Sequence, residues 1–219
     1  MKGLSLQTEK LLIRLSDLPV IREFTLVGGS ALALQIGHRL SEDLDFCIWS
    51  KDLRKDKPTV DWPLIEKELQ PVGKITSRDV LGFDQVHFIV NNVKLTFLAK
   101  QHHLSPVKTP VHILNHIGCA DVEAIGAMKL ELILRRSEFR DYYDIYSILK
   151  EGWSLKELVL LASKYSRHLL KTRDALSFLS NGGNFRKDAG FSLLQPVYNV
   201  DQREIAAFIR EIILEEYAP

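Results

Sequence analysis

Two short clusters near the N-terminus carry groups that suit phosphate chemistry. Gly28-Gly29-Ser30 follows the apolar run FTLV, and Asp43-Leu44-Asp45 comes a short distance later. Two glycines after a strand let the backbone approach a ligand, because no Cβ stands in the way. A helix beginning there offers free N–H groups and a positive dipole end to phosphate oxygens. Ser30 can cap this helix or bind a phosphate, and a tight turn without any ligand would use the same residues.

The two aspartates are expected to share one face of a strand. The segment 43–49, DLDFCIW, is rich in aromatic and β-branched residues, as strands are. Because side chains alternate along a strand, Asp43 and Asp45 would point the same way, about 7 Å apart. Like charges side by side repel each other unless a cation compensates them. A hard divalent cation that also binds phosphates explains the pair; the alternative places Asp43 in the preceding loop.

The elements that position these residues form a mixed first half and a helical second half. The patterns predict strands at 24–27, 43–49, 73–77, 85–90 and 93–98, and helices at 5–22, 30–36 and 62–69. From residue 122 the pattern is helical, at 122–150, 154–165, 167–180 and 201–216. We therefore predict an α+β fold, with a mixed-sheet domain over residues 1–110 and a helical domain over residues 111–219.

The overall composition excludes several other classes of protein. The 219 residues carry a net charge of +1, so charge alone gives no case for a nucleic-acid or membrane partner. Cys47 and Cys119 are the only cysteines and form no CxxC, which argues against a disulfide scaffold or a cysteine zinc site. Without a long apolar run or signal-like start, we expect a cytoplasmic protein with no membrane association.

The order of strand, Gly-Gly-Ser, helix and a return strand with Asp-x-Asp resembles the polymerase-β-like nucleotidyltransferase superfamily. The fuller strings GGSAL at 28–32 and HRLSEDLDF at 38–46 resemble one subgroup, the AbiEii/AbiGii family of nucleotidyltransferase toxins. Members of that family read Gly-Gly-Thr-Ala-Leu and Arg-Phe-Ser-Glu-Asp-Leu-Asp-Phe at these places.

A second match lies in KLELILRRSEFRDYYD, residues 129–144. The family's lysine, two arginines and two aspartates correspond here to Lys129, Arg136, Arg140, Asp141 and Asp144. If the segment is one continuous helix, all of these except Asp141 share one face. Such a cationic stripe can place Lys129 on nucleotide phosphates. A solvated, salt-bridged face is the plainer interpretation, and a helix break at Ser137 would change the argument.

The resemblance implies an enzyme that moves a nucleoside monophosphate from a nucleoside triphosphate to an RNA (tRNA) or protein acceptor, with Mg²⁺ or Mn²⁺ as cofactor. It implies the toxin of a toxin–antitoxin or phage-defence pair, with a cognate antitoxin. The catalytic residues would be Asp43, Asp45, Lys129, Asp141 and Asp144, the first two holding the metal. The nucleotide would be held by Gly28, Gly29, Ser30, Lys129, Arg136 and Arg140.

One position departs from the superfamily pattern. A third carboxylate is expected on the strand 93–98, at about Thr96, where it would complete the metal site and accept a proton. Three interpretations stay open. Asp79 or Asp84 reaches the site from a loop; the enzyme works with two carboxylates, with Asp141 or Asp144 assisting; or the protein is a non-catalytic nucleotide- or partner-binding module that keeps the fold.

Overall fold

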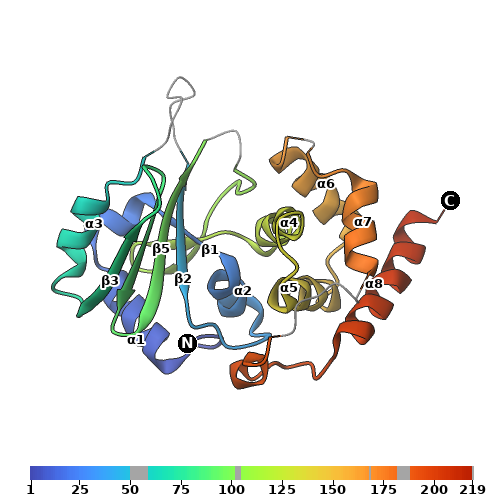
Figure 1. Cartoon of the computed structure of the whole chain (residues 1–219), viewed down its shortest axis with the longest axis horizontal. Helices are drawn as coiled ribbons and strands as arrows, with labels where there is room; N and C mark the ends of the chain where they lie inside the picture. The colour runs from blue at the N-terminus through green and yellow to red at the C-terminus, as the bar shows by residue number, and fades with distance from the viewer. Residues whose placement is uncertain (50–58, 102–104, 168, 182–187, 219) are drawn as a thin grey trace. The chain divides into compact units, whose positions relative to one another are not determined.

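The computed structural model describes residues 1–49, 59–101, 105–167, 169–181 and 188–218. The chain divides into two compact units. The first comprises residues 1–35 and 40–121, and the second comprises residues 36–39 and 122–219. The boundary therefore lies at 121/122 rather than at the expected 110/111, because a hairpin at 111–119 belongs to the sheet of the first unit. Figure 1 shows the sheet-containing unit mainly in blue to green and the helical unit mainly in yellow to red.

The first unit is built on a mixed seven-stranded sheet in the order β3-β4-β5-β2-β1-β7-β6. Two strand pairs in it, β2–β5 and β1–β7, are parallel, and the other four pairs are antiparallel. Along the chain the strands are β1 Thr25–Val27, β2 Leu44–Trp49, β3 Ile75–Val80, β4 Gln85–Val90, β5 Val93–Lys100, β6 Val111–Leu114 and β7 Ile117–Cys119. The prediction of an α+β fold with an N-terminal mixed sheet is confirmed.

Alternation along the central strands separates an apolar face of the sheet from the face that carries Asp45. Phe46, Phe88 and Phe97 are fully buried on the apolar face. The ring of Phe97 stacks on Phe46 with centroids 5.3 Å apart and meets Phe88 edge-on at 6.3 Å. Because this face is sealed by packing, only the opposite face of β2 can present Asp45 to a ligand.

The helices of the first unit begin at well-defined caps. Helix α1, Leu6–Leu15, is capped by Ser5, and α3, Trp62–Leu69, is capped by Asp61 with Pro63 in its first turn. Capping oxygens bind backbone N–H groups that the helix itself leaves free. Helix α2, Gly28–Ile36, follows β1 directly, and a short 3₁₀ helix, η1, spans Pro19–Glu23.

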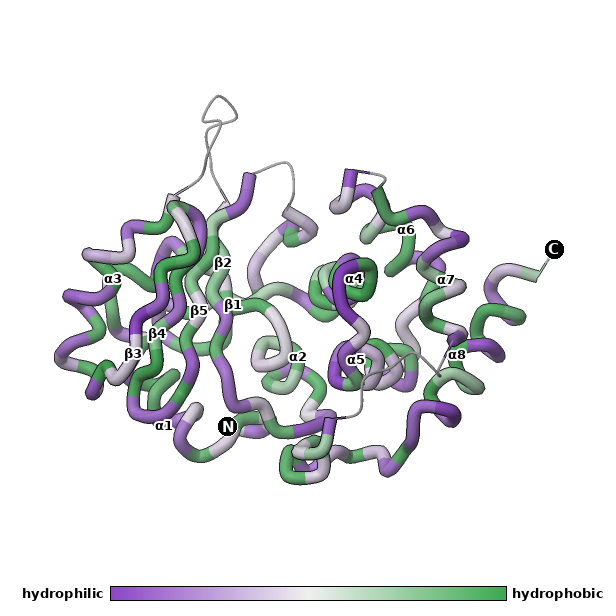
Figure 2. The backbone as a smooth tube through the Cα atoms, viewed as in Figure 1, coloured by the Kyte–Doolittle hydropathy of each residue, from purple (hydrophilic) through white to green (hydrophobic). Residues whose placement is uncertain are grey.

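The second unit is helical and buries an aromatic cluster. Its helices are α4 Val122–Ile133, α5 Phe139–Lys150, α6 Leu155–Tyr165, α7 Thr172–Ser180 and α8 Gln202–Tyr217, with a short 3₁₀ helix, η4, at Phe191–Leu194. Tyr143 of α5 packs against Phe191, with ring centroids 4.7 Å apart. Asp201 and Glu204 form a capping box at the start of α8. Hydrophobic and hydrophilic colours alternate around α8 in Figure 2, as expected of an amphipathic helix.

The structure corrects three expectations about the elements. The helix predicted over 122–150 is interrupted at 134–138, so α4 and α5 are separate helices. No strand was predicted after residue 98 and before residue 122, yet β6 and β7 form a hairpin there. The helix predicted at 5–22 ends at Leu15 and is followed by η1. The segment KDLRKDKPT, residues 51–59, is predicted to be a loop by its charges and its proline, and it falls almost wholly outside the described residues.

Both cysteines are buried and free, which agrees with small core residues. Burial raises the pKa of the Cys47 and Cys119 thiols to about 12, so both stay protonated and unreactive near neutral pH. Among the helices that the structure describes, none has the length and apolar character needed to cross a bilayer.

Candidate active site

Gly28 holds the backbone against the carboxylate of Asp45. It lies where β1 passes directly into α2, and Val27 before it pairs with Asp45 in the sheet. Its φ is +73°, a conformation that residues with a Cβ rarely adopt. A Cβ added to Gly28 would lie 2.8 Å from Oδ2 of Asp45. The backbone conformation therefore favours glycine here, and a Cβ would in addition displace the carboxylate of Asp45.

Ser30 supports the chain just before β2. It lies inside the first turn of α2, so it is not the cap that the sequence had offered as one possibility. Its side chain is buried, and its hydroxyl donates a hydrogen bond to the backbone carbonyl of Asp43. Ser30 therefore fixes the backbone of Asp43, and its proton is already engaged. Gly29, also in that first turn, is half-buried.

The two aspartates occupy different positions at the start of β2. Asp43 lies just before the strand and is exposed, whereas Asp45 is half-buried within it. The expectation that both belong to the strand is therefore wrong, and the alternative, Asp43 in the preceding loop, describes its place. In the part of the chain that the structure describes, the Asp45 carboxylate makes no hydrogen bond or ion pair. Its oxygens are free for a ligand.

Thr96 lies beside Asp45 on the neighbouring parallel strand, where the third carboxylate was expected. It is buried, and its hydroxyl is 3.1 Å from Nδ1 of His87. The two substitutes named from the sequence lie further away. Asp79 pairs with His87, two strands beyond Thr96. The backbone carbonyl of Asp84 accepts a bond from Ala99, three residues further along β5.

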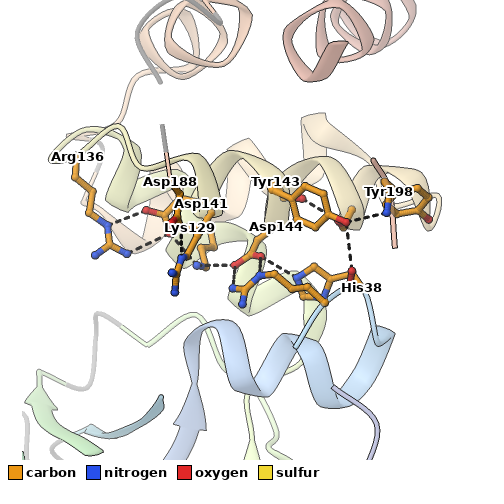
Figure 3. Close-up of polar contacts among 11 residues, drawn as sticks. His38, Lys129, Arg136, Asp141, Tyr143, Asp144, Asp188 and Tyr198 are labelled. Carbon is orange, nitrogen blue, oxygen red and sulfur yellow. Dashed lines mark hydrogen bonds and ion pairs between the residues drawn. The ribbon is translucent and has the colours of Figure 1, made fainter. Parts of the chain in front are cut away.

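Lys129 lies in a buried ion-pair network of the second unit (Figure 3). Its Nζ is 2.8 Å from Oδ1 of Asp141 and 2.7 Å from Oδ2 of Asp144. Arg136 holds Asp141 in a bidentate pair, at 2.7 Å and 3.1 Å. Because the helix is interrupted between Lys129 and Asp141, these residues come from α4, a connecting turn and α5. The single helical face, which depended on one continuous helix, is therefore not formed, and the break near Ser137 that the sequence left open is present.

His38 and Arg39 complete the network, although no role was predicted for either residue. Nε2 of His38 donates to Oδ1 of Asp144 at 2.8 Å. Arg39 reaches the same carboxylate with two bonds, Nε to Oδ1 at 2.8 Å and Nη2 to Oδ2 at 3.0 Å. Asp144 lies at the centre of the network in Figure 3 and is fully buried. The only available signal was the occurrence of His38 and Arg39 within the motif string HRLSEDLDF.

The network keeps both carboxylates ionised. Burial by itself would raise the pKa of Asp144, but Arg39 and then Lys129 outweigh it and hold this pKa well below 3.8. Burial would also raise the pKa of Asp141, but Lys129 and Arg136 outweigh this effect and lower it. Burial lowers the pKa of Lys129, but Asp144 and Asp141 more than compensate and raise it. Burial lowers the pKa of His38 despite Asp144, which favours neutral imidazole.

The five charged groups of this network carry an excess of one positive charge. Lys129, Arg136 and Arg39 face Asp141 and Asp144. Arg140 forms a partly exposed ion pair with Asp188, and this carboxylate also interacts electrostatically with Arg39. The arrangement can hold the Lys129 ammonium in one place, because two fixed carboxylates restrain it.

A cavity of about 380 Å³ in the first unit is a different feature from this site. It is lined by residues of η1, β2 and α3, among them Ile48 and Ile65, and by Phe24, which follows η1. Ile48 points to the apolar face of β2, opposite to Asp45, because side chains alternate. The cavity therefore does not involve Gly28 or Asp45.

The chain thus carries two motifs with residue types that a nucleotidyltransferase uses, one in each unit. A family model described as the nucleotidyl transferase AbiEii toxin of type IV toxin–antitoxin systems matches residues 10–216. The chain belongs to this AbiEii family. Membership makes it a nucleotidyltransferase toxin by family, and the match covers both units.

Other proteins share parts of this sequence or its fold. An uncharacterised protein of Aquifex aeolicus (strain VF5) is 29% identical over 178 residues, which are 77% of this chain and 79% of the relative. MenT4, a nucleotidyltransferase toxin of Mycobacterium tuberculosis H37Rv, has a similar structure (TM-score 0.57, 15% identity, 93% of this chain and 82% of that one). JHP933 of Helicobacter pylori also has a similar structure (TM-score 0.54, 18% identity, 97% of this chain and 94% of that one). At identities this low, the likeness to these two solved structures shows that the fold is shared.

Proposed function

We propose that this AbiEii-family protein is a Mg²⁺-dependent enzyme that transfers a nucleoside monophosphate from a nucleoside triphosphate to an RNA or protein acceptor. It would act in the cytoplasm as the toxin of a pair with a cognate antitoxin. The observation that carries the proposal is the Asp45 carboxylate, which is unpaired among the described residues and lies against Gly28 at the start of α2. A structural aspartate would normally have a hydrogen-bond or ionic partner.

The residues present fit a hard divalent cation. Asp43 and Asp45 offer only oxygen donors, which Mg²⁺ and Mn²⁺ prefer. A Cβ at Gly28 would crowd the Asp45 oxygen, so glycine keeps that oxygen accessible. The described residues contain no group of three or more His, Cys, Asp or Glu side chains placed to hold a metal by themselves. This donor set suits a cation shared with a nucleotide, whose phosphates complete the coordination. When bound, the cation would neutralise charge on the triphosphate.

The remaining groups would position the nucleotide and the acceptor. Gly28 and Gly29 present backbone N–H groups at the start of α2 to the phosphates, and Ser30 holds the backbone that carries Asp43. Lys129 would supply positive charge to the phosphates, held in place by Asp141 and Asp144. Arg136 would act through Asp141.

Label transfer tests the proposal directly. The protein is incubated with Mg²⁺, total tRNA or cell lysate, and each α-³²P-labelled triphosphate in turn. We expect one labelled acceptor band, with pyrophosphate released in equal amount, and loss of both in EDTA. Labelled nucleotide that binds but never transfers, with no pyrophosphate released, would instead favour a non-catalytic nucleotide-binding module, the alternative that Thr96 keeps open.

A further inference from the structure

Asp144 is held at both of its carboxylate oxygens by one side chain, that of Arg39. Nε of Arg39 donates to Oδ1 of Asp144 at 2.8 Å, and Nη2 donates to Oδ2 at 3.0 Å. His38 reaches only Oδ1, and Nζ of Lys129 lies 2.7 Å from Oδ2. A guanidinium that binds both oxygens fixes the plane of the carboxylate as well as its distance. Arg39 therefore fixes the direction in which Oδ2 faces the Lys129 ammonium.

The second carboxylate partner of Lys129 is held in the same way. Arg136 spans both oxygens of Asp141, with Nε on Oδ2 at 2.7 Å and Nη2 on Oδ1 at 3.1 Å. Nζ of Lys129 lies 2.8 Å from that Oδ1. In both pairs, Lys129 therefore binds the oxygen that also accepts from an arginine Nη2. Each of the two carboxylates that bind Lys129 has an arginine of its own.

The two arginines differ in their exposure to water. The Arg136 side chain is 49% exposed, whereas that of Arg39 is 4% exposed. Water weakens an exposed ion pair, so a pair that is both buried and bidentate restrains its partners more strongly. Burial would raise the pKa of Asp144, and Arg39 is the charge that does most to lower it and so to keep this carboxylate ionised. Of the two arginines, Arg39 is therefore the stronger restraint on the carboxylates that hold Lys129.

A lysine needs such a restraint more than an arginine does. Its ammonium ends a flexible four-carbon stem and is a point charge without a preferred plane. Lys129 is buried, and its Nζ has two carboxylate partners in the network. If Asp144 were able to turn, the ammonium would move with it. A displacement of about 1 Å at such a group can lower a rate by about 10²-fold.

We propose that Arg39 is a positioning residue of the transfer reaction. By holding both oxygens of Asp144, it keeps the Lys129 ammonium at the place from which this ammonium serves the phosphates. Arg39 acts through Asp144 and is assigned no contact of its own with nucleotide, metal or acceptor. All three residues belong to the second unit. The inference rests on the proposed function, in which Lys129 supplies positive charge to the phosphates, and it gives a role to a residue for which none was predicted.

The first test needs neither nucleotide nor metal. Nitrogen-15 NMR of the lysine ammonium groups in the full-length protein reports their exchange with water and their order, and Lys129→Arg assigns the Lys129 signal. In wild type, this ammonium should exchange slowly and be highly ordered. Arg39→Lys keeps the charge but lacks the planar fork that binds two oxygens, so the Lys129 signal should broaden and its order should fall. A mobile Lys129 ammonium in wild type, or an unchanged one in Arg39→Lys, would overturn the proposal.

The second test uses the label-transfer assay with the acceptor that the wild type labels, at varied nucleotide concentration. Arg39→Lys should lower kcat by about tenfold or more, because Lys129 is less well placed. The KM for the nucleotide should change less than about threefold, because the charge of the network is the same. Arg210→Lys is the matched control: Arg210 is exposed, lies in the same unit and donates from Nη1 to the backbone carbonyl of Ser180, so both constants should stay unchanged.

A loss of fold has to be separated from a loss of positioning. Unfolded protein lowers the apparent kcat without changing KM, so the folded fraction of each variant is measured by circular dichroism at the assay temperature. The value of kcat is then expressed per folded molecule. If Arg39→Lys is unstable, both tests are repeated in trimethylamine N-oxide, which favours the folded state, with wild type and Arg210→Lys under the same conditions.

The outcomes separate this inference from the proposed function. If folded Arg39→Lys keeps more than half of the wild-type kcat, Arg39 is not a positioning residue and the transferase assignment stands. A loss confined to KM would equally exclude the positioning role, because it would show that Arg39 contributes to nucleotide binding instead. If the wild-type protein transfers no label from any triphosphate, the proposed function fails and the role of Arg39 in transfer fails with it. The ammonium spectra would still show whether Arg39 orders Lys129.

Discussion

Asp144 offers the sharpest test of how the second unit is built. It is fully buried and accepts bonds from His38, Lys129 and, twice, Arg39. Asp144→Asn keeps the shape of the side chain but removes its charge, and the amide nitrogen cannot accept from these donors. Arg39 then loses two charge-assisted bonds, and Lys129 keeps Asp141 as its remaining carboxylate partner in this network.

The expected loss is large because positive charge is left buried without compensation. Removing one partner of a buried ion pair costs about 3–5 kcal/mol, and a whole domain has a free energy of unfolding of about 5–15 kcal/mol. For a chain of 150–250 residues, each kcal/mol shifts Tm by about 2–4 °C. Asp144→Asn should therefore lower the melting temperature of the second unit by about 6–20 °C.

Hydrogen exchange with mass spectrometry is the suitable assay, because it reads α4 and α5 separately from the sheet of the first unit. Peptides from both helices should exchange much faster in Asp144→Asn. Arg140→Ala is the matched control: its pair with Asp188 is partly exposed and should be worth at most about 1 kcal/mol. If Asp144→Asn melts within 2 °C of wild type and the exchange of α4 and α5 is unchanged, the network does not stabilise the unit and the reasoning is refuted.

Three further predictions address the two motifs. Gly28→Ala should lower the free energy of unfolding in urea by about 1–2 kcal/mol, because φ is +73° at this position. The same change should abolish transfer, because the new Cβ would lie 2.8 Å from Oδ2 of Asp45. Unchanged activity would contradict the importance of this close approach. Lys129→Ala should lower turnover by about 10²-fold, with Lys129→Arg recovering only part of it in the same steady-state assay; full activity of Lys129→Ala would remove the second motif from the mechanism. Asp141 and Asp144 have lowered pKa values, so the unfolded chain binds more protons at these groups in acid. The stability that these two carboxylates contribute is complete above their unfolded pKa near 3.8 and is lost as the pH falls below it. Urea unfolding of the wild type between pH 7 and pH 3 should show this loss, and Asp144→Asn should show a smaller one.

The strand–helix–strand motif was predictable because local signals agreed with one another. The sequence shows apolar runs bounded by glycines and by Asp-x-Asp. The elements predicted from them agree with the observed ends of β1, α2 and β2 to within one or two residues. Asn91-Asn92, a two-residue signal for a hairpin turn, lies between β4 and β5, and both residues have positive φ, as a tight turn of this type requires. Pairing of β5 with β2 placed Thr96 beside Asp45, where the sequence comparison had located it.

The rest depended on contacts that no local pattern encodes. Helical periodicity continues through residues 134–138, so the break between α4 and α5 could be suspected only from Ser137. The pairing of Arg39 with Asp144 joins residues 105 positions apart in sequence. His87 has ordinary strand surroundings in the sequence and gains its partner only when β4 pairs with β5. Tertiary pairing, and not propensity, decided these features.

The central claim is that Asp45 serves chemistry and not folding, and its most direct test is a comparison of Asp45→Asn with wild type. Transfer of α-³²P-labelled nucleotide in Mg²⁺ is measured together with urea unfolding of the metal-free protein. We expect the variant to lose transfer by at least about 10²-fold and to unfold at the same or a slightly higher urea concentration, because the described structure gives this carboxylate no partner. A variant that still transfers label, or that loses several kcal/mol of stability without metal, would contradict it.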